Sequence, residues 1–162
     1  MISEINLQQQ LNQFLQHATD QDRQALHEAL TALEQRQDET YIKALLQANH
    51  TYDASTNEVT ITLPILSFTK NRINIVHGGI TALIMDEAMG TLAHHNVAEN
   101  QTVVTTDMTT HYLKPGDGEK LTCIASMMQI GRKRLVAQAT VYDDHGEKVA
   151  FSTASFFSIT KR

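Results

Sequence analysis

A single long apolar segment at residues 77–97 constrains the fold of this 162-residue chain more than any other feature. The segment opens with His77-Gly78-Gly79, and its apolar residues recur at helical spacing instead of alternating. These residues form one broad stripe: Ile80, Leu83, Ile84, Ala88 and Leu92. A stripe of this width predicts a long helix whose apolar side is buried.

The segments on either side of this helix follow a period of two, which is typical of β-strands. Before the helix, Val59, Ile61 and Leu63 alternate with two threonines, and the strand ends at Pro64. After the helix, four strand-like segments lie at roughly 101–113, 119–130, 133–143 and 147–159. Turn sequences separate them: Pro115-Gly116-Asp117-Gly118, Gly131 and Asp143-Asp144-His145-Gly146. One helix between a first strand and an antiparallel meander predicts an α+β domain.

The first 50 residues differ from the rest because they contain no Gly or Pro and are rich in Gln, Leu and Ala. Apolar residues recur there at helical spacing three times, which predicts three short amphipathic helices. Ser3, Thr19 or Asp20, and Asp38 stand where the N-caps of these helices are expected. We therefore expect a helical extension at residues 1–50 and a second domain at residues 51–162.

The composition excludes several classes of partner. Thirteen basic and eighteen acidic side chains give a formal net charge of −5, the wrong sign for a protein that binds nucleic acid. The single cysteine, Cys123, excludes an intramolecular disulfide and offers no cysteine cluster for zinc. The N-terminus lacks a signal-peptide pattern, and no apolar run approaches the ~20 residues that span a bilayer. We expect a cytoplasmic protein with no membrane partner.

A motif at residues 71–86 connects the predicted first strand with the long helix. It reads Asn-Arg-Ile-Asn-Ile-Val-His-Gly-Gly-Ile-Thr-Ala-Leu-Ile-Met-Asp. The motif resembles the signature of PaaI-like acyl-coenzyme A thioesterases: Asn, five residues, His-Gly-Gly, and Asp seven residues after the second Gly. Four later segments follow in the order expected of that family: Thr105-Thr106-Asp107-Met108, Tyr112-Leu113-Lys114-Pro115, Gly131-Arg132 and Asp143-Asp144-His145-Gly146. The resemblance covers about 100 of the 162 residues and implies a hotdog fold, an antiparallel sheet wrapped around one long helix.

One motif position departs from the family pattern, because Asn74 stands where the family usually has Gly. Asn is the residue other than Gly that best tolerates positive φ. We therefore expect the loop to keep its shape.

The resemblance implies hydrolysis of an acyl-CoA thioester, which requires donors for the developing oxyanion and a carboxylate acting on water. The start of a helix leaves N–H groups unpaired, and Gly78 and Gly79 would let a carbonyl come close to them. The resemblance assigns the polarising N–H to Gly78. The alternative is that both glycines only permit a tight turn from strand to helix.

Asp86 lies in the middle of the apolar helix rather than at an end, where it could act as a cap. The resemblance makes it the catalytic carboxylate, either as a general base towards water or as a nucleophile that forms an anhydride. Both mechanisms stay open. Glu87 is turned from Asp86 by about 100° and is expected to be solvated, and it is the alternative carboxylate.

Three further positions match residues with family roles. Thr105 matches the position whose hydroxyl orients the attacking water, although an ordinary strand threonine would look the same. Asn71 matches the residue that holds either the substrate carbonyl or the turn. His77 is expected to make a structural hydrogen bond in the turn beside the substrate rather than to act as a base.

Arg132, Lys133 and Arg134 form the only dense basic run of the chain. Such a run in a turn is either solvated charge or a contact for the phosphates of coenzyme A. The remaining candidates for a metal site, His94-His95 and His111, lack metal-ligand spacing with Cys or carboxylates, so we expect no metal and no cofactor.

Two alternative functions stay open. Some hotdog domains follow a helical DNA-binding segment and sense acyl-CoA without hydrolysing it, but residues 1–50 hold seven acidic and three basic side chains, a poor match for DNA. Hotdog dehydratases use a different site with a His as the acid and base. The acyl group is left open, and the family implies self-association as a homodimer or a dimer of dimers.

Overall fold

The computed structural model describes residues 4–37 and 39–161, so the expected N-caps Ser3 and Asp38 lie outside it. The chain divides into two compact units. One contains the described residues through Leu46 together with Leu66–Phe68, and the other contains Gln47–Ile65 and the residues from Thr69 on. The expected domain boundary at residue 50 falls inside the first strand of the second unit.

The first unit consists mainly of three helices, as the sequence predicts: α1 (Glu4–His17), α2 (Asp20–Gln35) and α3 (Tyr41–Leu46). Thr19 caps α2, and its hydroxyl accepts the Asp22 N–H at 3.2 Å while the Asp22 carboxylate accepts the Thr19 N–H at 2.9 Å. This reciprocal capping box satisfies two donors that the start of a helix otherwise leaves unpaired.

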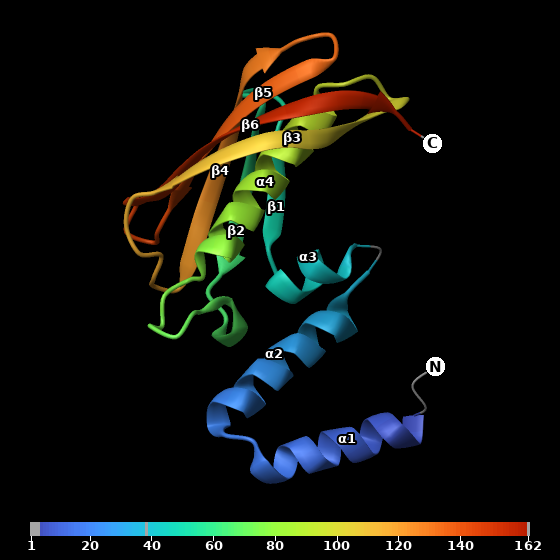
Figure 1. Ribbon diagram of the computed structural model, residues 1–162, viewed down its shortest axis with the longest axis vertical. Helices are drawn as coiled ribbons and strands as arrows, with labels where there is room; N and C mark the ends of the chain where they lie inside the picture. The colour runs from blue at the N-terminus through green and yellow to red at the C-terminus, as the bar shows by residue number, and fades with distance from the viewer. Residues whose placement is uncertain (1–3, 38, 162) are drawn as a thin grey trace. The chain divides into compact units, whose positions relative to one another are not determined.

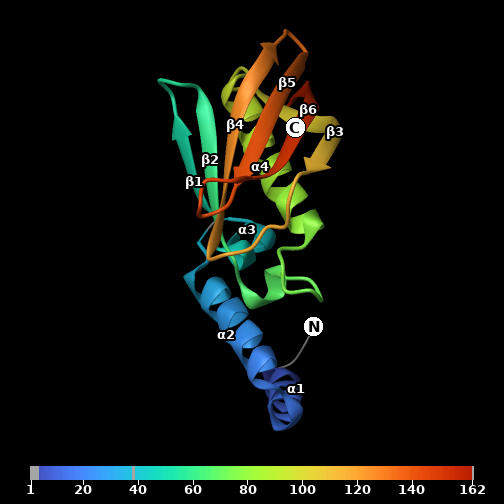
Figure 2. The same cartoon turned by 90° about the vertical axis from the view of Figure 1, so that its left-hand side faces the viewer.

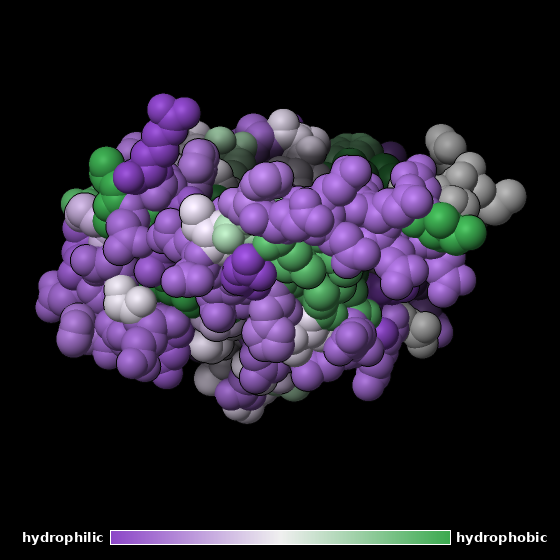
Figure 3. Space-filling model, turned by 90° about the horizontal axis from the view of Figure 1, so that it is seen from below, coloured by the Kyte–Doolittle hydropathy of each residue, from purple (hydrophilic) through white to green (hydrophobic). Residues whose placement is uncertain are grey.

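The helices of the first unit keep part of their apolar surface exposed. Their exposed large apolar side chains are Ile5, Leu7, Phe14, Leu30, Leu33, Tyr41 and Ile42. Seen from below, the surface is mainly hydrophilic, with apolar groups at its centre and at several other places (Figure 3). No helix within the described ranges is long and apolar enough to cross a membrane.

The second unit is built on a six-stranded sheet in the order β1-β2-β4-β5-β6-β3, in which every neighbouring pair is antiparallel. The strands are β1 (Asn49–Asp53), β2 (Glu58–Pro64), β3 (Gln101–Tyr112), β4 (Lys120–Ile130), β5 (Arg134–Tyr142) and β6 (Lys148–Thr160). β1 and β3 form the two edges (Figure 2). A short 3₁₀ helix, η1 (Ser67–Thr69), follows β2. The expected α+β architecture is confirmed.

Strand β1 is a difference from the sequence prediction, which begins the sheet at Glu58. Four of the five β1 residues are exposed, so the strand has no apolar alternation to mark it. Pairing with β2 across a tight turn creates it instead. Asn57 in that turn has a φ of 52°, and the Asp53 carboxylate accepts the Ser55 N–H at 2.8 Å.

Helix α4 (Gly78–His95) lies against one face of this sheet (Figure 1). Ile84, Ala88 and Leu92 are buried as expected, whereas Ile80 and Leu83 are only half-buried. Met85 and Met89, two flexible side chains, are fully buried instead. The buried side of the helix is therefore rotated from the predicted stripe towards these two residues. Small residues of the sheet lie beneath the helix and let it come close: Ala125, Ala137, Ala139 and Ala154.

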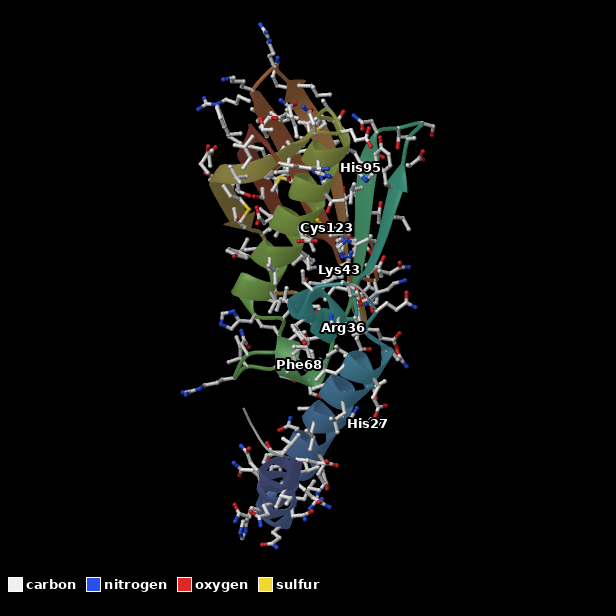
Figure 4. All side chains as sticks on the ribbon, turned by 90° about the vertical axis from the view of Figure 1, so that its right-hand side faces the viewer. His27, Arg36, Lys43, Phe68, His95 and Cys123 are labelled. Atoms are coloured by element: carbon white, nitrogen blue, oxygen red, sulfur yellow. The ribbon has the colours of Figure 1, made fainter. Side chains whose placement is uncertain are left out.

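The C-terminal end of α4 is fastened to the β1–β2 hairpin. The ring of His95, which Figure 4 labels, stacks on Tyr52 of β1, with centroids 3.9 Å apart. Asn96 and Asn57 exchange two side-chain hydrogen bonds of 3.1 Å each. The helix that carries the candidate site therefore lies on the sheet in a fixed position.

Candidate functional site

Asp86 and Thr105 meet at the edge of the second unit. Asp86 is half-buried on α4, and Thr105 is exposed on the edge strand β3. The Thr105 hydroxyl donates to Asp86 Oδ1 at 2.9 Å, and no described residue donates to Oδ2. One carboxylate oxygen is thereby held while the other is available to a water molecule or a substrate.

A cavity of about 310 Å³ opens beside this pair. Asp86, Gly90 and His94 line it along one side of α4, and Phe156 of β6 lines it from the sheet. Glu87 also borders the cavity but is exposed, as expected, and no hydrogen bond to Thr105 holds it. The geometry therefore favours Asp86 over Glu87 as the positioned carboxylate.

A β-bulge places Thr105 and Tyr112 on the same face of β3. The two residues are seven positions apart, so a regular strand would turn their side chains to opposite faces. The register against β6 shifts immediately after Thr105, with Thr106 as the extra residue. Thr105 then lies opposite Phe156 and Tyr112 opposite Ala150, two buried residues of β6. Both side chains consequently reach α4.

The start of α4 keeps one N–H free. His77 is the N-cap, and its Nδ1 accepts the Gly79 N–H at 3.0 Å. The His77 carbonyl accepts the N–H groups of Ile80 and Thr81, at 2.8 and 3.2 Å. Within the described ranges no acceptor faces the Gly78 N–H, which also lies at the positive end of the helix dipole. Of the two glycines, Gly78 is thus the one able to donate to a ligand.

Asn71 organises the loop before the helix. Its Oδ1 accepts the N–H groups of Ile73 and Ile75, at 3.0 and 3.4 Å, which leaves its amide N–H groups as the available donors. Asn74 has a φ of 63°, the left-handed conformation expected where the family has Gly. The departure from the motif therefore preserves the turn.

Asn71 and Gly78 line a second cavity of about 300 Å³, together with Tyr112 and Lys114. Neither Asp86 nor Thr105 borders this cavity. Gly78 and Asp86 are eight positions apart in α4, which corresponds to about 12 Å along the helix axis. A donor and a base must both lie within ~3 Å of the reacting atoms, so these two groups of one chain cannot serve the same carbonyl.

The exposed basic run lies at the turn between β4 and β5: Arg132 and Lys133 are in the turn, and Arg134 is the first residue of β5. The Lys133 carbonyl accepts the Ser158 N–H at 2.8 Å, and the next β6 residue, Ile159, pairs with Thr102 of the first cavity. The turn is therefore at the end of the sheet where α4 ends, away from Gly78. Arg132, Lys133 and Arg134 line neither of the two cavities.

An ion pair supports the wall of the second cavity. Lys114 Nζ lies 2.7 Å from Oδ2 of the buried Asp143, whose Oδ1 accepts the N–H groups of His145 and Glu147, at 3.0 and 2.8 Å. The Lys114 ammonium, followed by the Glu147 N–H, holds the pKa of Asp143 below its usual value. The hydrogen bond to Asp143 likewise raises the pKa of Lys114. The sequence offered both turns as motifs but did not indicate that they pair.

Replacing Asp143 by Asn should destabilise the protein at neutral pH. The stability of the variant should also fall less than that of wild type as the pH is lowered. A carboxyl whose pKa is lowered by folding stabilises fully above its ordinary value of 3.8 and loses this contribution as the pH falls through the lower folded value. The loss relative to wild type should therefore be largest near neutrality and shrink below about pH 4. Urea midpoints from pH 7 to about pH 2 measure it.

The matched control for this variant is Asp117→Asn. Asp117 is exposed in the neighbouring turn, so its substitution removes a carboxylate charge without breaking the Asp143 hydrogen bonds. Its midpoints should stay close to wild type. A difference between Asp143→Asn and wild type that is the same at every pH would contradict this account of Asp143.

Within residues 4–37 and 39–161, no group of three His, Cys, Asp or Glu side chains is placed to hold a metal ion. The chemistry that the residues themselves offer is a held carboxylate, a hydroxyl and a free N–H at a helix start. This set matches the needs of ester or thioester cleavage, in which negative charge develops on a carbonyl oxygen.

Comparison with known proteins identifies the group to which this arrangement belongs. The family model described as Thioesterase superfamily matches residues 73–150. That range contains the Gly78 turn, Asp86, Thr105 and the basic turn, whereas Asn71 lies two residues before it. A crystal structure of a Bacillus halodurans protein, solved with CoA, is 35% identical in sequence with a TM-score of 0.84, covering 92% of this chain and 100% of that chain.

Two further relatives are more distant. The Escherichia coli medium/long-chain acyl-CoA thioesterase YigI is 28% identical over 96 residues, which is 51% of this chain and 62% of YigI. The chain thus spans 62% of the length of the curated relatives that it matches. The E. coli PaaI protein from the phenylacetic acid degradation operon has a TM-score of 0.68 at 18% identity, covering 82% of this chain and 94% of PaaI. At this identity the likeness to PaaI is one of fold.

The antiparallel sheet packed on one long helix is a hotdog fold, as in PaaI. The likeness to the Bacillus halodurans protein extends over that whole chain. The chain belongs to the thioesterase superfamily, and the resemblance to PaaI-like hotdog thioesterases is confirmed.

Proposed function

We propose that the protein hydrolyses acyl-CoA thioesters to a free acid and CoA. The observation that carries this proposal is the hydrogen bond of 2.9 Å from Thr105 to Asp86, which positions a carboxylate on the central helix of a thioesterase-superfamily fold. The relatives support CoA esters as substrates, because YigI is an acyl-CoA thioesterase and the Bacillus halodurans protein was solved with CoA.

In the proposed reaction, the Gly78 N–H donates to the thioester carbonyl oxygen and stabilises the negative charge that develops there. Asp86 either takes a proton from water, which attacks the carbonyl carbon, or attacks that carbon itself to form an anhydride that water then hydrolyses. In both routes the bond from carbon to sulfur breaks and CoA leaves as a thiolate that is protonated. Thr105 fixes the direction of the carboxylate.

The active site is proposed to form between two copies of the chain. Gly78 and Asp86 of one chain lie about 12 Å apart along α4, too far to act on one carbonyl. Strand β3 is a 12-residue edge with β6 on one side and, in the described part of the chain, no strand on the other. A twofold axis that pairs two β3 edges brings equivalent patches together, so the Gly78 half of one copy can face the Asp86 half of its partner.

The proposed substrate contacts divide between the two halves. Asn71, with its free amide N–H groups, lies beside Gly78 and would assist in holding the carbonyl or the turn. His77 and Gly79 form the turn that borders the bound thioester, although the Gly79 N–H is occupied by His77. The exposed basic turn of Arg132, Lys133 and Arg134 would meet the CoA phosphates.

Thiol release from a panel of aryl, medium-chain and hydroxylated acyl-CoA esters tests the proposal. We expect turnover of at least one ester without added metal. Burial raises the pKa of the Cys123 thiol to about 12, so the protein's own thiol should give no background in this assay. Binding of acyl-CoA without any thiol release would contradict hydrolysis and would instead match an acyl-CoA sensor.

A further inference from the structure

Tyr112 touches the start of α4 in two ways. Its hydroxyl donates to the Gly78 carbonyl at 2.8 Å. Its ring also covers Gly78 so closely that a Cβ at position 78 would lie 3.3 Å from two ring carbons. The side chain is 54% exposed, so burial alone does not hold the ring in place. The absence of a side chain at Gly78 therefore lets the Tyr112 ring pack against the start of α4.

The peptide between Gly78 and Gly79 is consequently held at both of its polar ends. Tyr112 binds its carbonyl at 2.8 Å, and His77 Nδ1 accepts its N–H at 3.0 Å. Two successive glycines have the widest choice of backbone conformations, so these two contacts add restraint to the first turn of α4. The held peptide adjoins the His77–Gly78 peptide, which carries the free N–H.

We propose that Tyr112 is a positioning residue that fixes the Gly78–Gly79 peptide and thereby the direction of the Gly78 N–H. The inference rests on the proposed thioesterase function, in which that N–H polarises the carbonyl. A donor contributes to catalysis when it is already aimed at the oxyanion, and small misplacements cost large factors in rate. Tyr112 acts through Gly78 and does not itself need to touch the thioester.

The bulge in β3 joins this role to the carboxylate half of the site. Because Thr106 is the extra residue, Thr105 and Tyr112 both turn towards α4, one to Asp86 and the other to Gly78. One strand therefore positions the base and the donor of each chain. A shift of β3 along α4 would disturb both groups together.

Tyr112→Phe keeps the ring against Gly78 and removes only the hydroxyl. We expect kcat to fall about tenfold while KM stays within about twofold, since a misaimed donor weakens the transition state more than the bound substrate. The matched control is Tyr52→Phe, which removes another exposed tyrosine hydroxyl, bonded to Asn57 Oδ1 at 3.2 Å. Its kcat should stay within about twofold of wild type.

Amide hydrogen exchange of Gly79, followed by NMR on ¹⁵N-labelled protein, provides a readout that does not depend on activity. Loss of the Tyr112 hydrogen bond to the Gly78 carbonyl should loosen the peptide and speed exchange of the Gly79 N–H at least about threefold in Tyr112→Phe but not in Tyr52→Phe. A normal kcat for Tyr112→Phe, or a raised KM with normal kcat, would overturn the proposal. Unchanged exchange of Gly79 would overturn it as well.

The same measurements separate this inference from the proposed function. If the wild-type protein released no thiol from any ester but Gly79 exchange still rose in Tyr112→Phe, the hydrolase proposal would fail while the hold of Tyr112 on the peptide would stand. If thiol release were normal and exchange unchanged, the hydrolase would stand and Tyr112 would have no positioning role.

Discussion

Asp86→Ala should lower kcat for acyl-CoA hydrolysis by ~10²-fold or more, the loss typical of a missing positioned base or nucleophile. The carboxylate is the only group of the Asp86–Thr105 pair that can take a proton or attack carbon at neutral pH, so the Thr105 hydroxyl cannot replace it. The side chain is half-buried, and its hydrogen bond is to the exposed Thr105, so the variant should fold. Thiol release and circular dichroism measure the two outcomes.

Two variants accompany this test. Asp86→Asn keeps an oxygen that can accept from Thr105 but lacks the carboxylate, so it should be impaired to a similar extent with less disturbance of packing. Glu87→Ala removes the exposed neighbour that borders the same cavity and should retain most of the turnover. Full activity in Asp86→Ala together with loss in Glu87→Ala would show that Glu87 is the catalytic carboxylate.

The parts of the fold that the sequence predicted are those in which burial follows a simple period. Val59, Ile61 and Leu63 are fully buried, as their alternation predicts. Strand β1 was not predicted because an exposed edge strand shows no alternation of apolar residues. Its pairing with β2 comes from the hairpin turn. The buried stripe of α4 was placed slightly off because Met85 and Met89, rather than Ile80 and Leu83, face the sheet.

The candidate site shows the same division between local and non-local information. The motif from Asn71 to Asp86 located residues whose backbone and side-chain geometry depend mainly on the loop and helix that contain them. Tyr112 belonged to one of the sequence motifs but had no predicted role, because its contact with Gly78, 34 residues earlier in the chain, depends on the bulge in β3. A period-two pattern cannot show that an extra residue, Thr106, exchanges the two faces of a strand midway.

Mixing two impaired variants should restore activity if each site is shared between chains. Asn71→Asp keeps the oxygen that holds the loop but lacks the amide donors, so it damages the Gly78 half alone. Asp86→Ala damages the other half. Every site of either homodimer then lacks one group, whereas a mixed dimer collects both lesions in one site and leaves its second site intact.

Random exchange of subunits makes about half of the dimers mixed, so about a quarter of all sites should regain wild-type composition. Thiol release after co-refolding or co-expression should accordingly exceed the sum of the two separate preparations by a wide margin. Mixing Asp86→Ala with Asp86→Asn provides the control, because both lesions lie in the same half and no combination yields an intact site. No gain from the first mixture, despite verified exchange and two impaired parents, would show that the site is built within one chain. The 12 Å between Gly78 and Asp86 along α4 would then have to be closed by a conformational change of the helix start.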